Sequence, residues 1–227
     1  MKNILCTVCM RSGSVGLKNK HLVTLKRKPL MYHTIDFINS LKIFKYIVVS
    51  SDSKKILNYS KKKNIKNLIL RPKYLSSSKA SKIKVLQHAL FEMERKFNKK
   101  FDYLIDFDAT SPIRKKKDFQ QAFKIFIRKN ADLLITVTPS RKNPYFNMIQ
   151  ILNKKTFLVK NGNFVRRQDT PKIFDMNASF YIFKRNHLLK CKKLISKNTV
   201  AYIMPKKSAF DIDDIIDLKI NETLLKK

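Results

Sequence analysis

The sequence predicts an α/β protein built on a mostly parallel sheet. Short apolar runs alternate four times with segments whose apolar residues recur at helical spacing, which is the pattern of strands joined by crossover helices. Turns rich in Gly, Ser, Asp or Pro follow the apolar runs. A chain of 227 residues with 44% hydrophobic composition can bury one substantial core. We therefore expect a single domain over 1–227, with a small β-rich segment inserted at 140–185.

The first strand is predicted over residues 4–10, a nearly continuous apolar run typical of a strand covered on both faces. A turn of small and basic residues follows it, made of Arg11, Ser12, Gly13, Ser14, Gly16, Lys18 and Lys20. Small residues let backbone N–H groups approach an anion closely, so this turn suits a phosphate group. The sequence here is neither Gly-x-Gly-x-x-Gly nor a P-loop, and an ordinary strand-to-helix loop is the alternative.

The next elements continue the alternation. Strands are predicted at 46–49, 68–70, 103–107 and 133–137. Helices are predicted at 30–41, from Asp52 or Ser53 to about 62, at about 83–93, and around 119–127. Because consecutive parallel strands need such crossovers, their carboxyl ends should share one edge of the sheet.

The pattern changes after Pro139. Residues 145–183 contain short strands and turns, and Asn161-Gly162 predicts a hairpin there. Such an insertion often builds a lid or a subunit contact. A strand at 201–204 follows, and then a closing helix at 211–225 that should bury Ile212, Ile215, Ile216, Leu218 and Ile220.

The formal net charge of +34 raises the question of a nucleic-acid or membrane-surface partner. The lysines are scattered, whereas specific polyanion binders cluster theirs, so we expect no dedicated nucleic acid and no membrane. Three cysteines indicate a reducing compartment, and Cys6 and Cys9 should point to opposite faces of the first strand. The initial apolar run is cut short by Arg11, unlike a signal peptide, and a cytoplasmic location is expected.

Four polar groups follow predicted strands: 11–20, Arg71, 108–112 and 211–213. They should converge at the carboxyl edge, where open α/β sheets bind ligands. An extended backbone puts the carboxylates of Asp211 and Asp213 on one face, which suits Mg²⁺; a helix N-terminus is the equal alternative. Similarly, Thr110 and Ser111 can simply cap a turn, and Arg71 can form a surface ion pair.

Several ordered motifs together resemble the acylneuraminate cytidylyltransferases, also called CMP-sialic acid synthetases, over nearly the whole chain. They are 10–16 leading to Lys20, 70–72, 109–114, 166–169, 177–181 and 210–213. The segments 108–112, 143–147 and 175–179 are more similar to the branch acting on legionaminic acid. Three positions depart from the family pattern: Val15 replaces a lysine, His21 an asparagine, and Asp108 the glutamine of the sialic-acid branch.

The resemblance implies a Rossmann-like sheet of the nucleotide-diphospho-sugar transferase type and Mg²⁺-dependent transfer of CMP from CTP to a nine-carbon 2-keto sugar acid. It implies that Arg11 and Lys20 are catalytic, and that CTP contacts Arg11, Ser12, Gly13, Ser14, Lys20, Arg71, Asp108, Thr110 and Ser111. It assigns the sugar acid to Tyr145, Arg167, Gln168 and Asn177, and the metal to Asp211 and Asp213. It also implies a homodimer. The alternatives are a cytidylyltransferase for the eight-carbon acid Kdo and a basic nucleic-acid-binding protein without catalysis.

Overall fold

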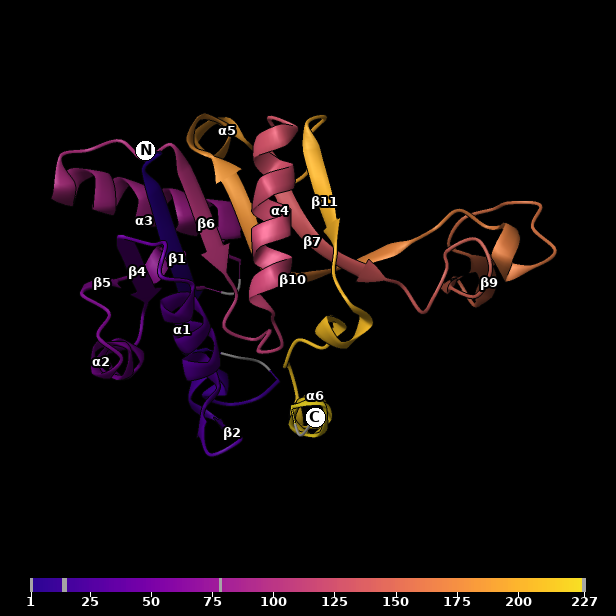
Figure 1. Ribbon diagram of the computed structural model, residues 1–227. Helices are drawn as coiled ribbons and strands as arrows, with labels where there is room; N and C mark the ends of the chain where they lie inside the picture. The colour runs from indigo at the N-terminus through magenta and orange to yellow at the C-terminus, as the bar shows by residue number, and fades with distance from the viewer. Residues whose placement is uncertain (1, 14–15, 78, 226–227) are drawn as a thin grey trace.

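A seven-stranded sheet in the order β11-β7-β10-β6-β1-β4-β5 forms the centre of the computed structural model, which describes residues 2–13, 16–77 and 79–225 (Figure 1). Its strands are β1 (Ile4–Met10), β4 (Tyr46–Ser51), β5 (Asn67–Leu70), β6 (Tyr103–Phe107), β7 (Leu133–Pro139), β10 (Phe174–Lys184) and β11 (Thr199–Ile203). Only β10 runs antiparallel to its neighbours, β6 and β7, so the mostly parallel α/β prediction is confirmed.

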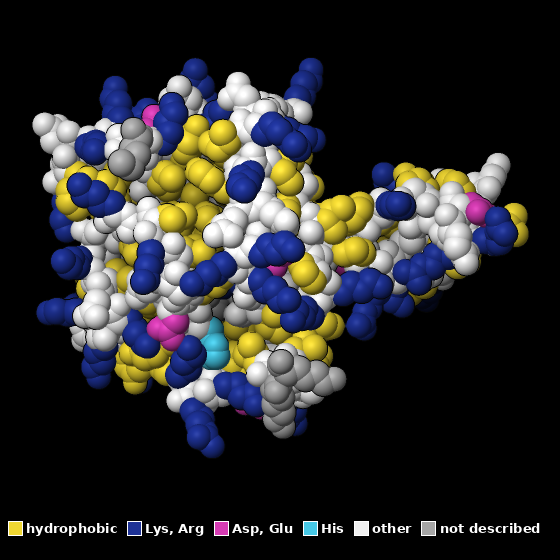
Figure 2. Space-filling view, in the orientation of Figure 1, with side chains coloured by type: hydrophobic (Ala, Val, Ile, Leu, Met, Phe, Trp, Pro, Cys, Tyr) yellow, Lys and Arg dark blue, Asp and Glu magenta, His cyan; other side chains and the backbone are white. Residues whose placement is uncertain are grey.

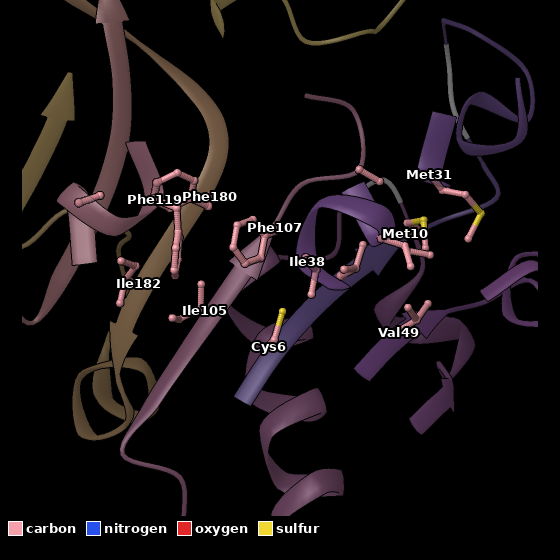
Figure 3. Packing of buried hydrophobic residues seen from close by; sticks show 14 of the residues in the cluster. Cys6, Met10, Met31, Ile38, Val49, Ile105, Phe107, Phe119, Phe180 and Ile182 are labelled. Carbon is pink, nitrogen blue, oxygen red and sulfur yellow. The ribbon is translucent and has the colours of Figure 1, made fainter. Parts of the chain in front are cut away.

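Helices cover both faces of this sheet (Figure 1). One face packs against α1 (Leu30–Leu41), α2 (Lys54–Lys62) and α4 (Lys116–Arg128), and the other against α3 (Lys82–Phe97) and α5 (Arg185–Lys190). Cys6 lies in the first layer, where Phe107, Phe119 and Phe180 pack together (Figure 3). Cys9 packs in the second layer, which confirms that the two cysteines point to opposite faces.

The turn chemistry explains where α2 begins. The side chain of Ser53 accepts a hydrogen bond from the Ile56 backbone N–H, which is an N-cap. Asp52, the alternative cap, instead accepts hydrogen bonds from the backbone N–H and hydroxyl of Ser12, at 2.8 Å each. The end of β4 is thereby tied to the turn that follows β1.

Residues 140–173 extend away from the sheet as an arm (Figure 1). The arm carries the hairpin of β8 (Ile149–Leu152) and β9 (Lys155–Leu158). The prediction that Asn161-Gly162 forms a hairpin turn is wrong, because the turn is Asn153-Lys154, both in the left-handed region that such turns require. Gly162 instead leaves room for the rings of Phe164 and Tyr145, which a Cβ atom would contact at 2.5 and 3.2 Å.

The predicted segment 140–185 reaches too far at its end. The last part of β10, from Phe180 to Lys184, pairs with both β6 and β7 inside the central sheet. A run of apolar residues at 180–183 is compatible with either an insertion strand or a buried central strand, and pairing decides between them.

The closing helix α6 (Ile215–Leu224) is shorter than predicted. Asp214 caps it, and Asp214 and Asp217 form a capping box. Ile212 and Leu218 are buried and Ile220 is half-buried, but Ile215 and Ile216 are exposed, so their predicted burial is wrong. Among the described residues, every helix is too short or too polar to span a bilayer.

Candidate active site

A cleft of about 380 Å³ opens where β1, β5 and β6 end. It brings together residues from all four predicted polar groups: Arg11, Lys20, Arg71, Asp108, Thr110, Asp211 and Asp213. Its other lining residues are Cys9, His21, Leu75, Ser77, Ala80, Lys82 and Val85. The parallel order of the strands explains this convergence, since strand ends far apart in the chain lie side by side at one edge of the sheet.

The turn after β1 packs directly against the segment that carries the two predicted metal ligands. A Cβ atom on Gly16 would collide with the carbonyl of Asp213, so only glycine fits there. The Lys20 ammonium lies 2.5 Å from an Asp213 carboxylate oxygen. Gly13 faces open space, and Ser14 and Val15 lie outside the described residues. Gly16 is therefore required for close approach.

Asp211 and Asp213 precede α6 rather than cap it, because Asp214 is the cap. Between them Ile212 is fully buried, and its N–H donates to the carbonyl of Thr110. This anchor leaves the Asp211 and Asp213 side chains in the cleft lining. Burial and the neighbouring carboxylates of Asp213 and Asp108 raise the pKa of Asp211.

The donor set fits a divalent cation. Two carboxylates in one cleft, one with its pKa raised by burial and by like charge, gain from a nearby cation. Mg²⁺ is commonly held by one or two carboxylates together with substrate phosphates and water. The described residues contain no cluster of three or more His, Cys, Asp or Glu side chains arranged for a metal, so phosphate oxygens would have to complete the coordination.

Asp108 follows β6 and turns its carboxylate into the cleft lining. Its Oδ1 accepts from the backbone N–H and the hydroxyl of Thr110, at 3.0 and 2.9 Å. Burial opposes its ionisation, but Lys82 and the hydrogen bonds from Thr110 outweigh burial and hold the pKa of Asp108 well below its usual range. Asp108 is therefore an ionised hydrogen-bond acceptor at neutral pH.

Arg71 and Arg114 anchor the cleft from beneath. Arg71 is buried and donates to the carbonyl oxygens of Met10 and Ser50, which fastens the ends of β1 and β4. Arg114 donates to the Asp108 and Ser179 carbonyls, and burial lowers its pKa to about 10. Both guanidinium groups are thus bound to backbone carbonyls.

His21, which the sequence marked only as a departure from the family pattern, lines the cleft. It is buried, and burial lowers its pKa to about 4, so the imidazole is neutral at neutral pH. Its Nδ1 has no hydrogen-bond partner among the described residues. A buried polar atom without a partner, in a residue that lines a cleft, calls for an explanation, and a ligand is one candidate.

The predicted sugar residues lie elsewhere. Arg167 and Gln168 line a separate hollow of about 480 Å³ at the base of the arm, and Tyr145 stacks edge-on with Phe164. Asn177 is buried and donates to the Ser208 carbonyl at 2.9 Å. Within one subunit these residues do not reach the cleft. Ser111 is also withdrawn from it, since its buried hydroxyl donates to the Asn177 carbonyl at 3.1 Å.

Sequence reasoning missed Lys82 and Asp106. Asp106 offered a signal, because it lies two residues before Asp108 and so on the same face of the strand. Lys82 offered none, since nothing in a lysine-rich stretch distinguishes the one that reaches the cleft.

Comparison with known proteins agrees with this architecture. The chain is 42% identical to the post-translational flagellin modification protein B of Campylobacter coli, over 100% of this chain and 97% of that protein. It is 40% identical to the CMP-N,N'-diacetyllegionaminic acid synthase of Campylobacter jejuni, over 99% and 96%. A solved CMP:2-keto-3-deoxy-manno-octonic acid synthetase complexed with CTP has the same fold, with a TM-score of 0.71, 12% identity and 99% of both chains covered.

Residues 5–224 match the family described as cytidylyltransferase. With a match over almost the whole chain and relatives at 40% identity or more, this protein belongs to the cytidylyltransferase family and is a nucleotidyltransferase.

Proposed function

We propose that this enzyme transfers CMP from CTP to a nonulosonic acid of the legionaminic type and releases pyrophosphate. The observation that carries the proposal is the 40% identity, over 99% of the chain, to a protein named for CMP-N,N'-diacetyllegionaminic acid synthesis. The likeness to the octonic acid synthetase, at 12% identity, supports the fold only, so it does not favour the Kdo alternative.

The reaction requires positioning and charge neutralisation rather than covalent catalysis. The anomeric hydroxyl oxygen of the sugar acid attacks the α-phosphorus of CTP and loses its proton, while the bond from that phosphorus to the bridging oxygen breaks and pyrophosphate departs. Arg11 and Lys20 line the cleft as cations that can bind phosphate oxygens. We propose them as the catalytic pair, with Ser12, Gly13 and Ser14 beside them as the CTP turn.

Asp211 and Asp213 would hold Mg²⁺ in this cleft. The metal would neutralise charge on the phosphate oxygens during transfer. Lys20 pairs with Asp213 and lines the same cleft, which supports a role for it beside the proposed metal ligands. Arg71 and Thr110 would then line the nucleotide pocket, and Ser111 would support it from behind.

Pyrophosphate release tests the proposal. With CTP and Mg²⁺, we expect a diacetylated legionaminic-type acid to give a kcat/KM about 10-fold or more above that of N-acetylneuraminate, because burying an unpaired hydroxyl of the latter costs about 1 to 3 kcal/mol. An equal value for N-acetylneuraminate would contradict the substrate branch. No pyrophosphate release with any nonulosonic acid would contradict the function and favour the non-catalytic, nucleic-acid-binding alternative.

Arg11 provides a second test. Its replacement by alanine should weaken CTP binding as well as slow turnover, since a guanidinium binds phosphate in both the ground state and the transition state. Calorimetric titration with CTP measures the first effect. Lys18, a nearby lysine that does not line the cleft, supplies the matched control Lys18→Ala. An unchanged CTP affinity for Arg11→Ala would place Arg11 outside the site.

We further propose that the arm forms the contact of a homodimer. Its hairpin exposes Ile149, Ile151, Leu152 and Phe157, more apolar surface than an isolated hairpin needs. Such a contact would also allow the sugar residues of one subunit, Tyr145, Arg167 and Gln168, to meet the cleft of another. Sedimentation should show a dimer for the wild type and a monomer for Ile151→Asp; a monomeric wild type would contradict the proposal.

We propose a cytoplasmic location, because CTP is available there. The charge distribution agrees with the expectation of no dedicated nucleic-acid partner: Lys and Arg side chains are spread over the face seen in Figure 2 and reach onto the arm.

A further inference from the structure

Beneath the cleft lies a group of four side chains that we call the β6 clamp: Thr7, Asp106, Lys82 and Asp108. Asp106 and Asp108 lie two residues apart on β6 and at its end, so both point to the same side of the sheet. The Lys82 ammonium, at the start of α3, lies 3.0 Å from Asp106 Oδ2 and 3.3 Å from Asp108 Oδ2. One cation therefore bridges two carboxylates.

The two carboxylates differ in whether an oxygen atom remains free to accept a further hydrogen bond. Asp106 is 1% exposed, and both its oxygens have partners, because the Thr7 hydroxyl donates to Oδ1 at 2.7 Å and Lys82 pairs with Oδ2. Asp108 is 25% exposed and lines the cleft. Its Oδ1 already accepts two hydrogen bonds from Thr110, whereas Lys82 is the only partner of its Oδ2 within 2–13, 16–77 and 79–225. Oδ2 thus retains a free acceptor position.

The position of the Lys82 ammonium is restrained by two further contacts. The ammonium lies 4.5 Å from the centre of the Tyr181 ring, on the neighbouring strand β10, and is bound to the buried Asp106. A cation held by an aromatic face and a buried carboxylate is a fixed point. The Asp108 carboxylate is consequently held from two sides, by Thr110 and by Lys82.

We infer that Lys82 is a positioning residue that holds Asp108 ionised and oriented as the acceptor for an uncharged N–H or O–H donor of the substrate. The inference rests on the proposed function and identifies Asp108 as the side chain that accepts a hydrogen bond from the substrate. Phosphate and sugar carboxylate are excluded as partners of Asp108, because like charges repel. The donors that remain are the amino group of cytosine, the hydroxyls of ribose, and the hydroxyl and acylamino N–H groups of the sugar acid.

Asp108→Asn tests the acceptor directly. The Thr110 N–H requires an oxygen, so the amide oxygen should stay on Thr110 and the amide NH₂ should face Lys82 and the cleft. The variant replaces an acceptor by a donor of the same shape. We expect kcat/KM to fall about 10-fold or more, since a site built to hydrogen-bond a substrate group discriminates strongly when the pairing is lost.

Lys82→Met tests the positioning role. If Lys82 acts through Asp108, the double variant Lys82→Met/Asp108→Asn should be within about 3-fold of Asp108→Asn alone, because the two residues act as one unit. Lys82→Arg should retain most activity, since a guanidinium can also bridge two carboxylates. Lys84→Met, on an exposed lysine of the same helix, is the control. If the fold-losses of the two single variants multiply in the double variant, the two residues act independently and the inference is wrong.

Three substrate pairs identify the source of the donor: CTP against UTP, CTP against 2'-deoxy-CTP, and the C7-acylamino sugar acid against its C7-hydroxyl counterpart. For each pair the ratio of kcat/KM is compared between wild type and Asp108→Asn. The ratio that falls about 10-fold or more names the group that Asp108 binds. If no ratio changes and the sugar acid binds wild type and Asp108→Asn equally tightly, the inference is wrong.

Binding separates this inference from the proposed function. Calorimetric affinities for the same nucleotides and sugar acids need no turnover. A wild type that releases no pyrophosphate refutes the proposed function alone, and the affinity ratios of wild type and Asp108→Asn still test the clamp. Urea unfolding of each variant shows whether it is folded. If Lys82→Met is unfolded, Asp108→Asn and Lys82→Arg, which keep the Lys82 position charged, decide the outcome.

Discussion

Two pairs of aspartates, each separated by one residue, face this cleft with opposite electrostatics. In the first pair, Asp106 and Asp108 share the Lys82 ammonium, and the pKa of Asp108 is held well below its usual range. In the second pair, Lys20 reaches only Asp213, whose side chain is 71% exposed, and burial together with like charge raises the pKa of Asp211. The same spacing thus produces one pair in which a single ammonium bridges both carboxylates, and one, which we call the open pair, in which Lys20 pairs with Asp213 and not with Asp211.

The difference indicates which pair can take a cation. A carboxylate pair already bridged by an internal ammonium has little to gain from Mg²⁺, whereas a pair with unshared charge has much to gain. The backbone reinforces the difference, because β6 buries Asp106 and leaves Asp108 in the cleft lining, while the Ile212 anchor holds both Asp211 and Asp213 in that lining. Under the proposed function, the first pair would bind a substrate donor and the second the metal.

The largest expected effect is at the open pair. Asp213→Asn removes a negative charge from the proposed metal site and should lower turnover at least about 10-fold, which corresponds to about 1.4 kcal/mol of transition-state stabilisation. Turnover measured over a range of Mg²⁺ concentrations should show a higher requirement for the metal in the variant. Near-normal turnover at low Mg²⁺ would remove the distinction between the two pairs.

Gly16→Ala should have the next largest effect and should act on the open pair alone. Its Cβ would collide with the Asp213 carbonyl and push the turn of Arg11 to Lys20 away from the metal segment. We expect kcat/KM to fall about 3- to 10-fold, because small displacements of positioning groups reduce rate. Gly13→Ala, where a Cβ meets nothing within 4 Å, should cost less. Equal losses for both variants would contradict the role given to the close contact.

Sequence reasoning predicted the strands and crossover helices, because the spacing of apolar residues along the chain distinguishes the two. It also predicted that polar strand ends converge, because strands joined by crossover helices run parallel and end at the same edge of the sheet. It could not predict that Asp214 caps α6, since Asp211, Asp213 and Asp214 are equally good caps by type. It could not find Lys82, because the partners of a long flexible side chain depend on helix placement. The hairpin turn was misplaced because Asn153-Lys154 lacks the glycine that usually marks such turns.

The third expected effect concerns stability. Lys82→Met leaves Asp106 and Asp108 facing each other without a cation, and Asp106 is buried. Breaking a fully buried pair costs about 3 to 5 kcal/mol, and we expect about 2 kcal/mol here because the Lys82 side chain is 37% exposed. Lys20→Met should cost less than about 1 kcal/mol, since its partner is largely exposed. Urea unfolding measures both; a larger loss for Lys20→Met would reverse the comparison.

The smallest expected effect is on how stability changes with pH, because the contributions of Asp211 and Asp108 to stability should change in opposite directions. The pKa of Asp211 is raised in the folded protein, so the folded state binds more protons, and this carboxyl lowers stability as pH rises above its ordinary pKa. The pKa of Asp108 is lowered, so that carboxyl stabilises the fold above its ordinary pKa, and the contribution disappears as pH falls through the folded-state value. At about pH 7 without metal, Asp211→Asn should therefore raise the free energy of unfolding, by less than about 1 kcal/mol, and Asp108→Asn should lower it.

Urea unfolding between about pH 3 and pH 7 distinguishes the two aspartates. The gain from Asp211→Asn should shrink toward zero at the acid end, where the wild-type carboxyl is protonated in both the folded and unfolded states. The loss from Asp108→Asn should begin to shrink only as pH falls below the ordinary pKa of a carboxyl, and should disappear only near the lower folded-state pKa of that residue. If both substitutions shifted stability in the same direction at about pH 7, Asp211 would not carry the unshared charge on which the proposed metal site depends.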